Sequence, residues 1–483
     1  MTIIINGHTI FAQSSYSLTI EREEETVPCC AVSTENNEVI ASLNRLRFGE
    51  QSGISELIRI DANGKITDSL VFSSIPNRFY KIAQIGQSIH EGTYFGFGWQ
   101  WTDVGTSYYL WIFEFDDSFN ILWENIIDTL DHAPALAQLR HWNNHFFMGI
   151  LIVRNSTSST SYVYKTTEYG ELLNKVSVPR PGEAFTSSST EVYYLRQIPK
   201  TSFFLMNRGS FDSYCAVMDD DLNYIYSIYS NNYPPQKQLL LSPLDLEFFN
   251  DTEFILSGVT RKIESDNRKV LAVKKKDTSS NNDFKIRKFG YEGWEIGPFG
   301  CYAAGYKNLA MHSDYFFTGG WAFSSSNLYP DYDNFIMLYA FNYDLDSLWA
   351  TNIGNDAYYA LFYISPSPDG GCVLAASRYD WRKGDQKRNA LIIKLPKPDI
   401  TSISESEKPK PFASVYPNPG DNLFLVQTEL TLFTLQLYDL QGQLLLTQQN
   451  LTEVNTEKLP SGYYIYRIIA DDGRATNGKW VKK

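Results

Sequence analysis

A pattern of about 55 residues repeats through most of the 483-residue chain, and it limits the fold more than any other feature. Each copy holds an apolar strand, a polar turn and a second strand, as in ELIRIDANGKITDSLVF at 56–72. The turns open at positions spaced 51 to 67 residues apart, namely Asp61, Asp116, Thr167, Asp219, Lys275, Asn342 and Pro396. Seven copies at one period indicate a repeat architecture, in which each copy is one supersecondary unit.

Two further apolar runs precede each turn. Before the copy at Trp111, for example, stand FYKIAQI (79–85) and TYFGFGW (93–99). Short runs rich in Tyr, Phe, Ile and Val, bounded by Gly, Asn, Asp and Pro, predict strands rather than helices. The repeating unit is therefore four antiparallel strands, which is one blade of a β-propeller.

The two ends of the repeat complement each other. The seventh copy stops after ALIIKLP (390–396), without its outer strand, and SYSLTIE (15–21) is left unmatched at the start. Pairing these two segments would leave no half-blade with an open edge. We therefore predict an all-β chain with a seven-bladed β-propeller over residues 14–395, in which Tyr16–Glu21 is the outer strand of the last blade.

Composition excludes several classes of protein. Aromatic residues make up 15% of the chain, which excludes disorder and coiled coil for the whole. A net charge of −13 argues against nucleic-acid binding. A membrane-spanning helix is not predicted, because the sequence contains no run of 18 apolar residues. The five cysteines form neither a disulfide framework nor a C-x-x-C pair, so most are expected to be buried, although one bridge involving Cys29 or Cys30 stays open.

The first residues allow two interpretations. Residues 1–13 begin with MTIIINGHTIFA, an apolar stretch that ends in a small residue and resembles the end of a secretory signal peptide. The cut would fall near Ala12 or Gln13. No basic segment precedes the apolar run, so a frayed N-terminus or a misassigned start is the alternative.

The last part of the chain has a different character. Residues 396–411 are rich in Pro, Lys, Ser and Glu, which predicts a solvated linker. Residues 412–483 then alternate apolar and polar side chains in four runs, at 423–428, 434–440, 443–449 and 463–470. This pattern predicts a small antiparallel β-sandwich.

Four motifs in this segment resemble, in order and spacing, the C-terminal sorting domain of type IX secretion substrates. They are VYPNPGDNLFLV (415–426), LYDLQGQLL (437–445), LPSGYYIYRI (459–468) and the basic end GKWVKK (478–483). The residues that carry the resemblance are Tyr416, Pro417, Asn418, Pro419, Asp439, Gly442, Leu459, Pro460, Gly462 and Tyr464. The resemblance implies recognition by the type IX machinery, passage from the periplasm across an outer membrane, and release or attachment at the cell surface. The alternative is an unrelated immunoglobulin-like module.

The repeat region also resembles secreted repeat propellers whose blades carry an apolar strand, Asp-x-x-Gly and an aromatic strand. LIRIDANGKI (57–66) matches best, and other copies lose the glycine. This resemblance implies a fold but no particular function.

Signatures of catalysis are missing from the sequence: there is no H-E-x-x-H, G-x-S-x-G, P-loop or dinucleotide fingerprint. Asp219–Asp221, and Asp344 with Asp346, resemble calcium ligands, but they fall in the repeated turns, where Asp and Asn close hairpins. His141 and His145 flank a hairpin turn rather than sharing a helix face. We predict no metal and no cofactor.

Long polar loops after the second strand of each blade are the predicted binding face. Such loops on a rigid scaffold concentrate binding residues. The segment from Arg261 to Lys269 is one such loop, and the candidate ligand-binding residues are Trp99, Trp101, Arg208, Trp321, Trp381 and Arg382. We expect these six side chains to be at least partly exposed on one rim, where Trp suits sugar rings and Arg suits carboxylates. Blade-capping aromatics are the alternative.

Two classes of function follow. The first is a secreted or surface protein that binds a glycan, a peptide or a protein, with uronate-like or acidic peptide ligands favoured over cations. The second is an extracellular hydrolase or lyase that acts on polysaccharide. Without a catalytic signature the sequence favours the first class.

Overall fold

The computed structural model forms two compact units, Met1–Ile400 and Thr401–Lys483, which are described separately. It describes residues 15–46, 53–72, 78–102, 107–155, 158–177, 192–201, 204–208, 214–229, 242–263, 266–277, 284–290, 301–303, 307–322, 329–398, 413–428, 430–439, 443–470 and 475–483. The N-terminal segment 1–13, most of the linker 396–411 and Gly442 lie outside these residues. In the described parts, no helix has the length and apolar character needed to cross a membrane.

The first unit contains five four-stranded antiparallel sheets in chain order. The first two sheets are β2 (Glu25–Ser33), β3 (Val39–Leu46), β4 (Gly53–Ile60) and β5 (Ile66–Phe72), and β6 (Arg78–Gln87), β7 (Thr93–Thr102), β8 (Tyr108–Asp116) and β9 (Ile121–Leu130). The third is β10 (Pro134–Trp142), β11 (His145–Asn155), β12 (Ser158–Thr167) and β13 (Leu172–Ser177). The last two are β14 (Val192–Gln197), β15 (Phe204–Arg208), β16 (Tyr214–Met218) and β17 (Tyr224–Tyr229), and β18 (Ser242–Phe248), β19 (Glu253–Ile263), β20 (Asp266–Asp277) and β21 (Phe284–Phe289).

An eight-stranded sheet completes this unit. Its strands are β22 (Cys301–Ala303), β23 (Ala310–Met311), β24 (Tyr315–Ala322), β25 (Asn334–Asn342), β26 (Ser347–Pro366), β27 (Cys372–Tyr379), β28 (Arg388–Leu395) and β1 (Tyr16–Ile20). The first half of β26 pairs with β25, and its second half pairs with β27. β1 pairs antiparallel with β28, from Tyr16 opposite Lys394 to Ile20 opposite Ala390, which is the pairing that the sequence predicted.

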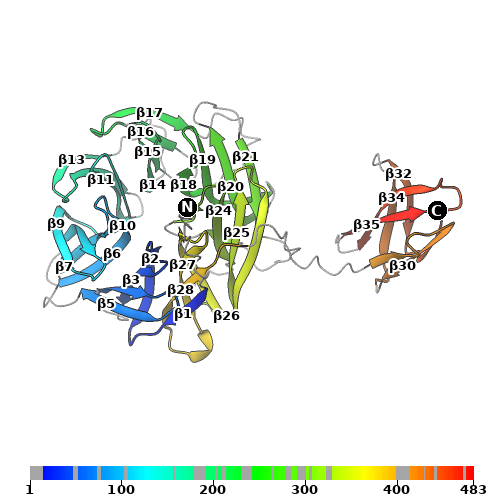
Figure 1. Ribbon diagram of the computed structural model, residues 1–483, viewed down its shortest axis with the longest axis horizontal. Helices are drawn as coiled ribbons and strands as arrows, with labels where there is room; N and C mark the ends of the chain where they lie inside the picture. The colour runs from blue at the N-terminus through cyan, green and yellow to red at the C-terminus, as the bar shows by residue number, and fades with distance from the viewer. Residues whose placement is uncertain are drawn as a thin grey trace, which may run out of the picture. The chain divides into compact units, whose positions relative to one another are not determined.

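The sheets follow one another around a ring (Figure 1). Inner strands of consecutive sheets are in contact, from β2 with β6 to β14 with β18, and β2 also contacts β26, β27 and β28. The hydrophobic core lies between neighbouring sheets: one cluster joins Ile40 and Ile58 of the first sheet to Trp111 of the second and Ile392 of the last. The fold is therefore all-β and propeller-like.

The repeated turns confirm the turn interpretation of the acidic pairs. The Asp61 carboxylate accepts hydrogen bonds from the backbone N–H groups of Asn63 and Lys65, at 2.9 and 2.8 Å. Asp219 Oδ1 accepts from Asp221 and Asn223 in the same way, at 3.0 and 2.8 Å. These bonds lower the pKa of the Asp61 carboxyl, most strongly through the Lys65 N–H. The acidic residues at these positions therefore close hairpins.

A second repeated feature, a β-bulge in the innermost strand, was not predicted. The pairing of the first and second strands shifts register between Pro28 and Cys30, between Ile82 and Gln84, and between Pro243 and Asp245. The second half of β26 shifts between Leu361 and Tyr363. A bulge redirects the side chains that follow it. Bulges therefore change where inner-strand side chains point, next to the ring centre.

Among the residues that the structure describes, Cys29, Cys30 and Cys372 have free, buried thiols. The disulfide that the sequence allowed for Cys29 or Cys30 is therefore not formed. Cys29 Sγ instead accepts a hydrogen bond from Asn44 Nδ2 at 2.6 Å. Cys30 Sγ accepts one from the Ile85 N–H of the next sheet at 3.1 Å. Burial raises the pKa of the Cys29 thiol to about 11, so this thiol stays protonated at neutral pH.

The second unit contains two antiparallel sheets. One has β29 (Ala413–Tyr416), β30 (Leu423–Thr428) and β33 (Glu453–Asn455), and the other has β32 (Leu444–Gln449), β31 (Phe433–Tyr438), β34 (Gly462–Ala470) and β35 (Ala475–Lys482). Side chains from both sheets share one core, in which Phe424, Leu435 and Trp480 are fully buried.

The motif residues of this unit hold its last strand. Asn418 donates from Nδ2 to the Lys479 carbonyl at 2.6 Å and accepts from the Val481 N–H at 3.0 Å. The Trp480 indole N–H donates to the Pro417 carbonyl at 2.9 Å. Lys482, which is buried, donates from Nζ to the carbonyls of Thr456 and Leu459 at 2.5 and 2.7 Å. The Tyr-Pro-Asn-Pro segment and the basic end therefore fix β35 in place.

Candidate functional site

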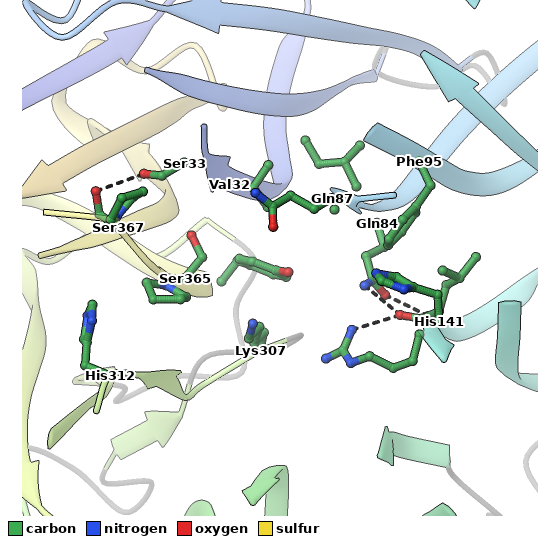
Figure 2. A pocket seen from close by; sticks show the side chains of 17 residues that line it. Val32, Ser33, Gln84, Gln87, Phe95, His141, Lys307, His312, Ser365 and Ser367 are labelled. Atoms are coloured by element: carbon green, nitrogen blue, oxygen red, sulfur yellow. Dashed lines mark hydrogen bonds between the residues drawn. The ribbon is translucent and has the colours of Figure 1, made fainter. Parts of the chain in front are cut away.

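A cavity of about 490 Å³ lies where the inner strands of the ring end (Figure 2). Its wall includes Ser33 at the end of β2, Gln87 at the end of β6, His141 near the end of β10 and Pro366 at the end of β26. Each of these strands belongs to a different sheet or half-sheet, so the cavity lies at one mouth of the central channel.

The cavity wall is polar and basic. Its polar residues are Ser33, Gln84, Gln87, Arg140, His141, Lys307, His312, Tyr363, Ser365 and Ser367. Of the seventeen described residues that line it, none has a carboxylate side chain. This is unusual in a chain with 55 acidic and 42 basic residues, and it gives the cavity the opposite charge from the molecule as a whole.

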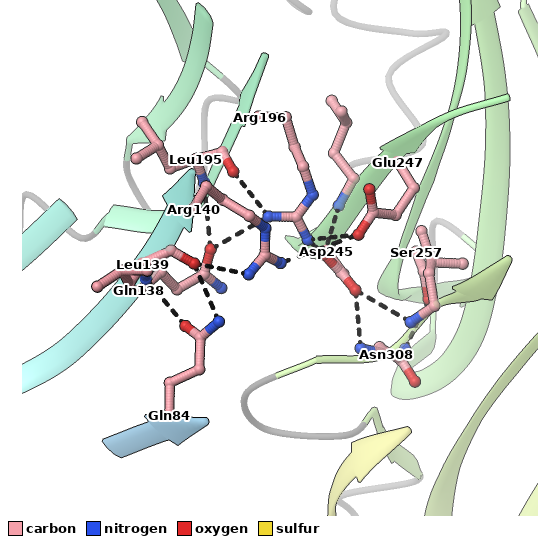
Figure 3. Close-up of polar contacts among 12 residues, drawn as sticks. Gln84, Gln138, Leu139, Arg140, Leu195, Arg196, Asp245, Glu247, Ser257 and Asn308 are labelled. Atoms are coloured by element: carbon pink, nitrogen blue, oxygen red, sulfur yellow. Dashed lines mark hydrogen bonds and ion pairs between the residues drawn. The ribbon is translucent and has the colours of Figure 1, made fainter. Parts of the chain in front are cut away.

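A cluster of charged side chains lies beside this wall, on three neighbouring inner strands (Figure 3). Arg196 of β14 donates to Asp245 of β18 at 2.5 Å and lies 2.9 Å from Glu247 of β18. Arg140 of β10 lies 3.9 Å from Glu247 Oε1. The side chains of Arg196 and Asp245 are 4% and 0% exposed, whereas those of Arg140 and Glu247 keep about a fifth of their surface open.

Polar side chains of the inner strands also bind the backbone of the next sheet. Gln84 accepts from the Leu139 N–H at 2.9 Å and donates to the Leu139 carbonyl at 3.0 Å. Asp245 Oδ2 accepts from the N–H groups of Asn308 and Leu309, at 2.9 and 3.0 Å. Because these bonds satisfy buried polar groups across the gap between sheets, they fix the geometry of the channel mouth.

Protonation in the cluster follows from burial and neighbouring charge. Burial raises the pKa of Asp245 despite the nearby Arg196. Burial also acts against the charge of Glu247, but Arg196, Lys307 and Arg140 outweigh it, so the pKa of Glu247 is lowered. With all five groups charged, three cations face two carboxylates, and the channel mouth is positive.

Lys307 brings a primary amine to the middle of the cavity (Figure 2). Its backbone is held against β26, since the Ile364 N–H donates to the Lys307 carbonyl at 2.9 Å. Its Nζ lies 5.8 Å from the centre of the Tyr363 ring. The pKa of Lys307 is lowered to about 8, chiefly by burial; the positive charges of Arg140 and Arg196 contribute to this lowering, and Glu247 and Asp245 oppose it.

The six residues predicted from the loops do not line this cavity. Trp99, Trp101, Arg208 and Trp321 belong to β7, β15 and β24 rather than to loops, because strand pairing continues through them, as in Trp101 opposite Tyr108. They lie at the other end of their sheets, since Trp101 pairs with Phe79 at the start of β6 while the cavity lies at its end. Trp99 and Trp321 are 4% and 8% exposed, which differs from the expected exposure.

The remaining two predicted residues form a local cluster. Trp381 and Arg382 begin a 3₁₀ turn, η2 (Trp381–Lys383). Trp381 is half-buried and donates to Asp333 Oδ1 at 3.0 Å, while the exposed Arg382 guanidinium lies over the Trp381 ring and pairs with the Asp333 carboxylate. The charge of Arg382 is therefore already neutralised. The expected loop from Arg261 to Lys269 is also mostly strand, because β19 and β20 pair as far as Ile263 opposite Asp266.

His141 and His145, which are four residues apart in sequence, have different surroundings. His145 is bonded from its ring to the Asn143 carbonyl at 2.6 Å, whereas His141 lines the cavity. Burial and the nearby Arg140 lower the pKa of His141, so this ring is neutral at neutral pH. No group of three or more His, Cys, Asp or Glu side chains that could hold a metal ion occurs among the residues that the structure describes.

Sequence reasoning missed Arg140, Arg196, Asp245, Glu247 and Lys307. The available signal was a charged residue inside an apolar inner strand, as in ALAQLRHW (135–142) and PLDLEF (243–248). Such residues are rarely buried unless they are paired. The oppositely charged partners lie 49 to 107 residues apart in sequence, so the signal gives no indication of which residues meet.

These features define a propeller-like, all-β chain followed by a small β module. Residues 414–483 of that module match the family "Secretion system C-terminal sorting domain". The segment is therefore a type IX sorting domain, which confirms the expectation from its motifs. It directs recognition by the type IX machinery and export to the cell surface or the extracellular space.

Solved structures similar to the chain are propeller-type proteins. The polysaccharide lyase Uly1 is 8% identical, with 80% of this chain and 100% of that chain covered and a TM-score of 0.44. The WD40 domain of SCAP from fission yeast is 8% identical over 80% and 99% of the two chains, with a TM-score of 0.37. The NanB sialidase from Streptococcus pneumoniae is 10% identical over 81% and 70%, with a TM-score of 0.39. No curated protein matches the chain.

Proposed function

We propose that the first unit is a seven-bladed β-propeller. In this interpretation the eight-stranded sheet contains two blades that share β26, and β1 is the outer strand of the last blade. The propeller spans residues 14–395, the linker 396–411, and a β-sandwich sorting domain 412–483. Limited proteolysis is expected to cut first within 396–411, because this composition cannot bury a core. A first cut inside a blade would contradict these boundaries.

We further propose that the exported propeller binds an acidic glycan at the channel mouth. The observation that carries this proposal is the cavity itself, which is lined by Arg140, Lys307 and neutral polar groups and by no described carboxylate. An Arg guanidinium matches a carboxylate or sulfate in two-point geometry, and a partly buried cavity strengthens the attraction. Acidic peptides present the same anion without sugar hydroxyls for the Ser and Gln side chains, so they serve as the comparison in the test.

The test measures binding of the full chain to uronate oligosaccharides, to neutral oligosaccharides of equal length and to acidic peptides. Arg140→Gln is expected to weaken uronate binding about 10- to 100-fold, because a hydrogen bond to a charged group contributes about 1.5–3 kcal/mol. Lys200→Gln is the matched control, since the Lys200 side chain is 77% exposed and pairs with Asp251 at the surface. Equal binding of neutral and acidic oligosaccharides, or unchanged binding by Arg140→Gln, would contradict the proposal.

The second candidate is a polysaccharide-active enzyme. It is favoured by one observation, the amine of Lys307 in a cavity with the Tyr363 phenol beside it. The six loop residues predicted from sequence are not part of either proposal, because none of them lines the cavity.

A further inference from the structure

We propose that the channel mouth cleaves 4-linked uronate polysaccharides by β-elimination, with Lys307 as the base that removes the proton beside the uronate carboxylate. This inference rests on the proposed binding of acidic glycans. It adds to that proposal a reaction, a bond that breaks and a role for each of three residues.

Elimination beside a carboxylate needs three groups on one site. A cation must neutralise the carboxylate, because the carbon that bears it becomes acidic only then. A base must be able to lose its own proton near the working pH. A proton donor must meet the departing oxygen. Arg140, Lys307 and Tyr363 all line the cavity, from β10, from the segment before β23 and from β26.

The position of Lys307 makes it the base of this set. Burial in the channel is the largest cause of its lowered pKa, which is about 8. Glu247 and Asp245 oppose this shift, whereas the guanidinium charges of Arg140, which lines the same wall, and of Arg196 add to it. A lysine at the surface holds its proton up to a pH of about 10.4. Lys307 therefore has a substantial neutral fraction in weakly alkaline solution.

Tyr363 supplies the proton. Burial raises the pKa of its phenol, so the hydroxyl stays protonated throughout the range in which Lys307 becomes neutral. The backbone bridge between Lys307 and Tyr363 fixes the two residues side by side. Lys307 Nζ lies over the Tyr363 ring, 5.8 Å from its centre, so the amine and the phenol ring are neighbours in one part of the wall and a uronate would lie against both from the open side of the cavity.

The step is balanced without any further reactant. Lys307 takes the proton from C5 of the uronate, and the electron pair of the C5–H bond forms the C4–C5 double bond. The C4–O bond breaks, and the departing oxygen takes its proton from the Tyr363 phenol. The ammonium of Lys307 then returns a proton to the phenolate through water, which restores both groups.

The same lining argues against hydrolysis at this cavity. Most glycoside hydrolases use a pair of carboxyl groups on either side of the bond that breaks. The described cavity wall has no carboxylate, and the two acids nearby, Asp245 and Glu247, are engaged by Arg196. Elimination needs no carboxylate from the protein.

Binding and cleavage should respond to pH in opposite directions. Anion binding is favoured by the charged form of Lys307, so it weakens as pH rises through about 8. Proton abstraction requires the neutral amine, so kcat rises through the same range. A purely structural or purely ligand-binding lysine would not produce this rise.

The decisive variant is Lys307→Arg in the full chain, because arginine keeps the positive charge but cannot act as a base below a pH of about 12. The probes are polygalacturonate, alginate and hyaluronan, and the readout is the ultraviolet absorbance and mass of the unsaturated chain ends. We expect Lys307→Arg to lower kcat by about 10²- to 10⁴-fold and to abolish the alkaline rise, with binding of the same probes changed less than about threefold. Lys200→Arg is the control, and it should leave both quantities at their original values.

Each other outcome has a definite meaning. Unsaturated ends formed by Lys307→Arg at the original rate would overturn the inference. A rise in KM with unchanged kcat would also overturn it, because Lys307 would then be a binding group only. If the original chain binds these probes but releases no unsaturated ends, elimination is wrong and acidic-glycan binding stands. If it binds none of them, the proposed function itself is wrong.

Discussion

The repeated turns at the outside of the sheets and the inner strands at the channel use polar residues in contrasting ways. In the turns, Asp61 and Asp219 bind backbone groups two and four residues further along the chain, and both stay exposed to solvent. In the inner strands, Asp245 binds Arg196, which is 49 residues earlier, and the Asn308 backbone, which is 63 residues later. The turns therefore use the same local hydrogen bonds from copy to copy, whereas the inner strands use different long-range partners.

This contrast separates scaffold from function. A turn that closes on itself can use a similar small polar residue in copy after copy, because its partners are always its own neighbours. Asp116, Thr167 and Asn342 accept backbone N–H groups in their turns as Asp61 and Asp219 do. An inner strand faces the strands of other copies, so each copy can carry a different side chain while the ring keeps its geometry. Cys30, Gln84 and Asp245 each accept a backbone N–H of the next sheet, although their chemistry differs completely.

The largest test of this contrast is Asp245→Ala. The substitution leaves the buried Arg196 without the carboxylate that lies 2.5 Å away, and it removes the acceptor for two backbone N–H groups. Breaking a buried pair by removing one partner costs about 3–5 kcal/mol. We expect a loss of this size in the free energy of unfolding, measured by urea titration.

Glu253→Ala provides the comparison on the same sheet. Glu253 pairs with Lys275 at 3.0 Å, and both side chains remain between a fifth and a third exposed. Exposed pairs contribute about 0–1 kcal/mol, so this variant should unfold nearly as the original chain does. Equal losses for Asp245→Ala and Glu253→Ala would mean that the inner cluster is no more important to the fold than a surface pair.

The next test concerns the pH dependence that Lys307 gives to stability. Its folded pKa of about 8 lies below the value of about 10.4 for an unfolded lysine, so the unfolded chain binds more protons between these values. The contribution of Lys307 to the free energy of unfolding therefore increases as pH rises from 8 to 10. In Lys307→Met this contribution is absent.

Near pH 7 the free energy of unfolding of Lys307→Met should exceed that of the original chain by a margin on the order of 2 kcal/mol, the largest difference in this pH range. The margin should shrink steadily up to pH 10. Comparing two variants at each pH cancels the titration of the many buried tyrosines, which both chains share. A margin that is constant from pH 7 to 10 would show that Lys307 titrates as a surface lysine does.

Sequence reasoning therefore succeeded where the cause is local. The strand pattern, the turns and the sorting motifs all depend on residues within about ten positions of one another, as Asp61 and Lys65 do. The pairing of β1 with β28 spans the whole unit, yet it was predictable because one strand was missing and one was left over. Arg140 and Glu247 could not be paired in the same way, since nothing in either strand specifies the other.

The predicted binding face and the cavity lie at different places in the fold, for a related physical reason. The prediction placed Trp and Arg residues in exposed loops after the second strand of each blade. In the structure, strand pairing continues through Trp101 and Trp321, so these two residues belong to strands. Packing between sheets then buries Trp321 among Tyr358 and Tyr379. The bulges of the inner strands, which redirect side chains at the channel, leave no mark in the spacing of apolar residues.

The smallest effect is expected in the outer turns, with Asp61→Ala. The substitution removes the acceptor for the Asn63 and Lys65 N–H groups, but both groups are exposed and can bind water instead. We expect only a small loss in the free energy of unfolding, well below the loss for Asp245→Ala, because water replaces the lost acceptor. Lys65→Ala, which keeps both backbone bonds, should change stability by less than about 0.5 kcal/mol.

Because the Asp61 carboxyl has a lowered pKa in the folded chain, its contribution is present above pH 4 and is lost as pH falls through the folded value. Acid titration of Asp61→Ala against the original chain should therefore show the two stabilities converging below pH 4. If the gap between them persists in acid, or if Asp61→Ala costs as much as Asp245→Ala, the turns contribute to the fold by more than their own hydrogen bonds.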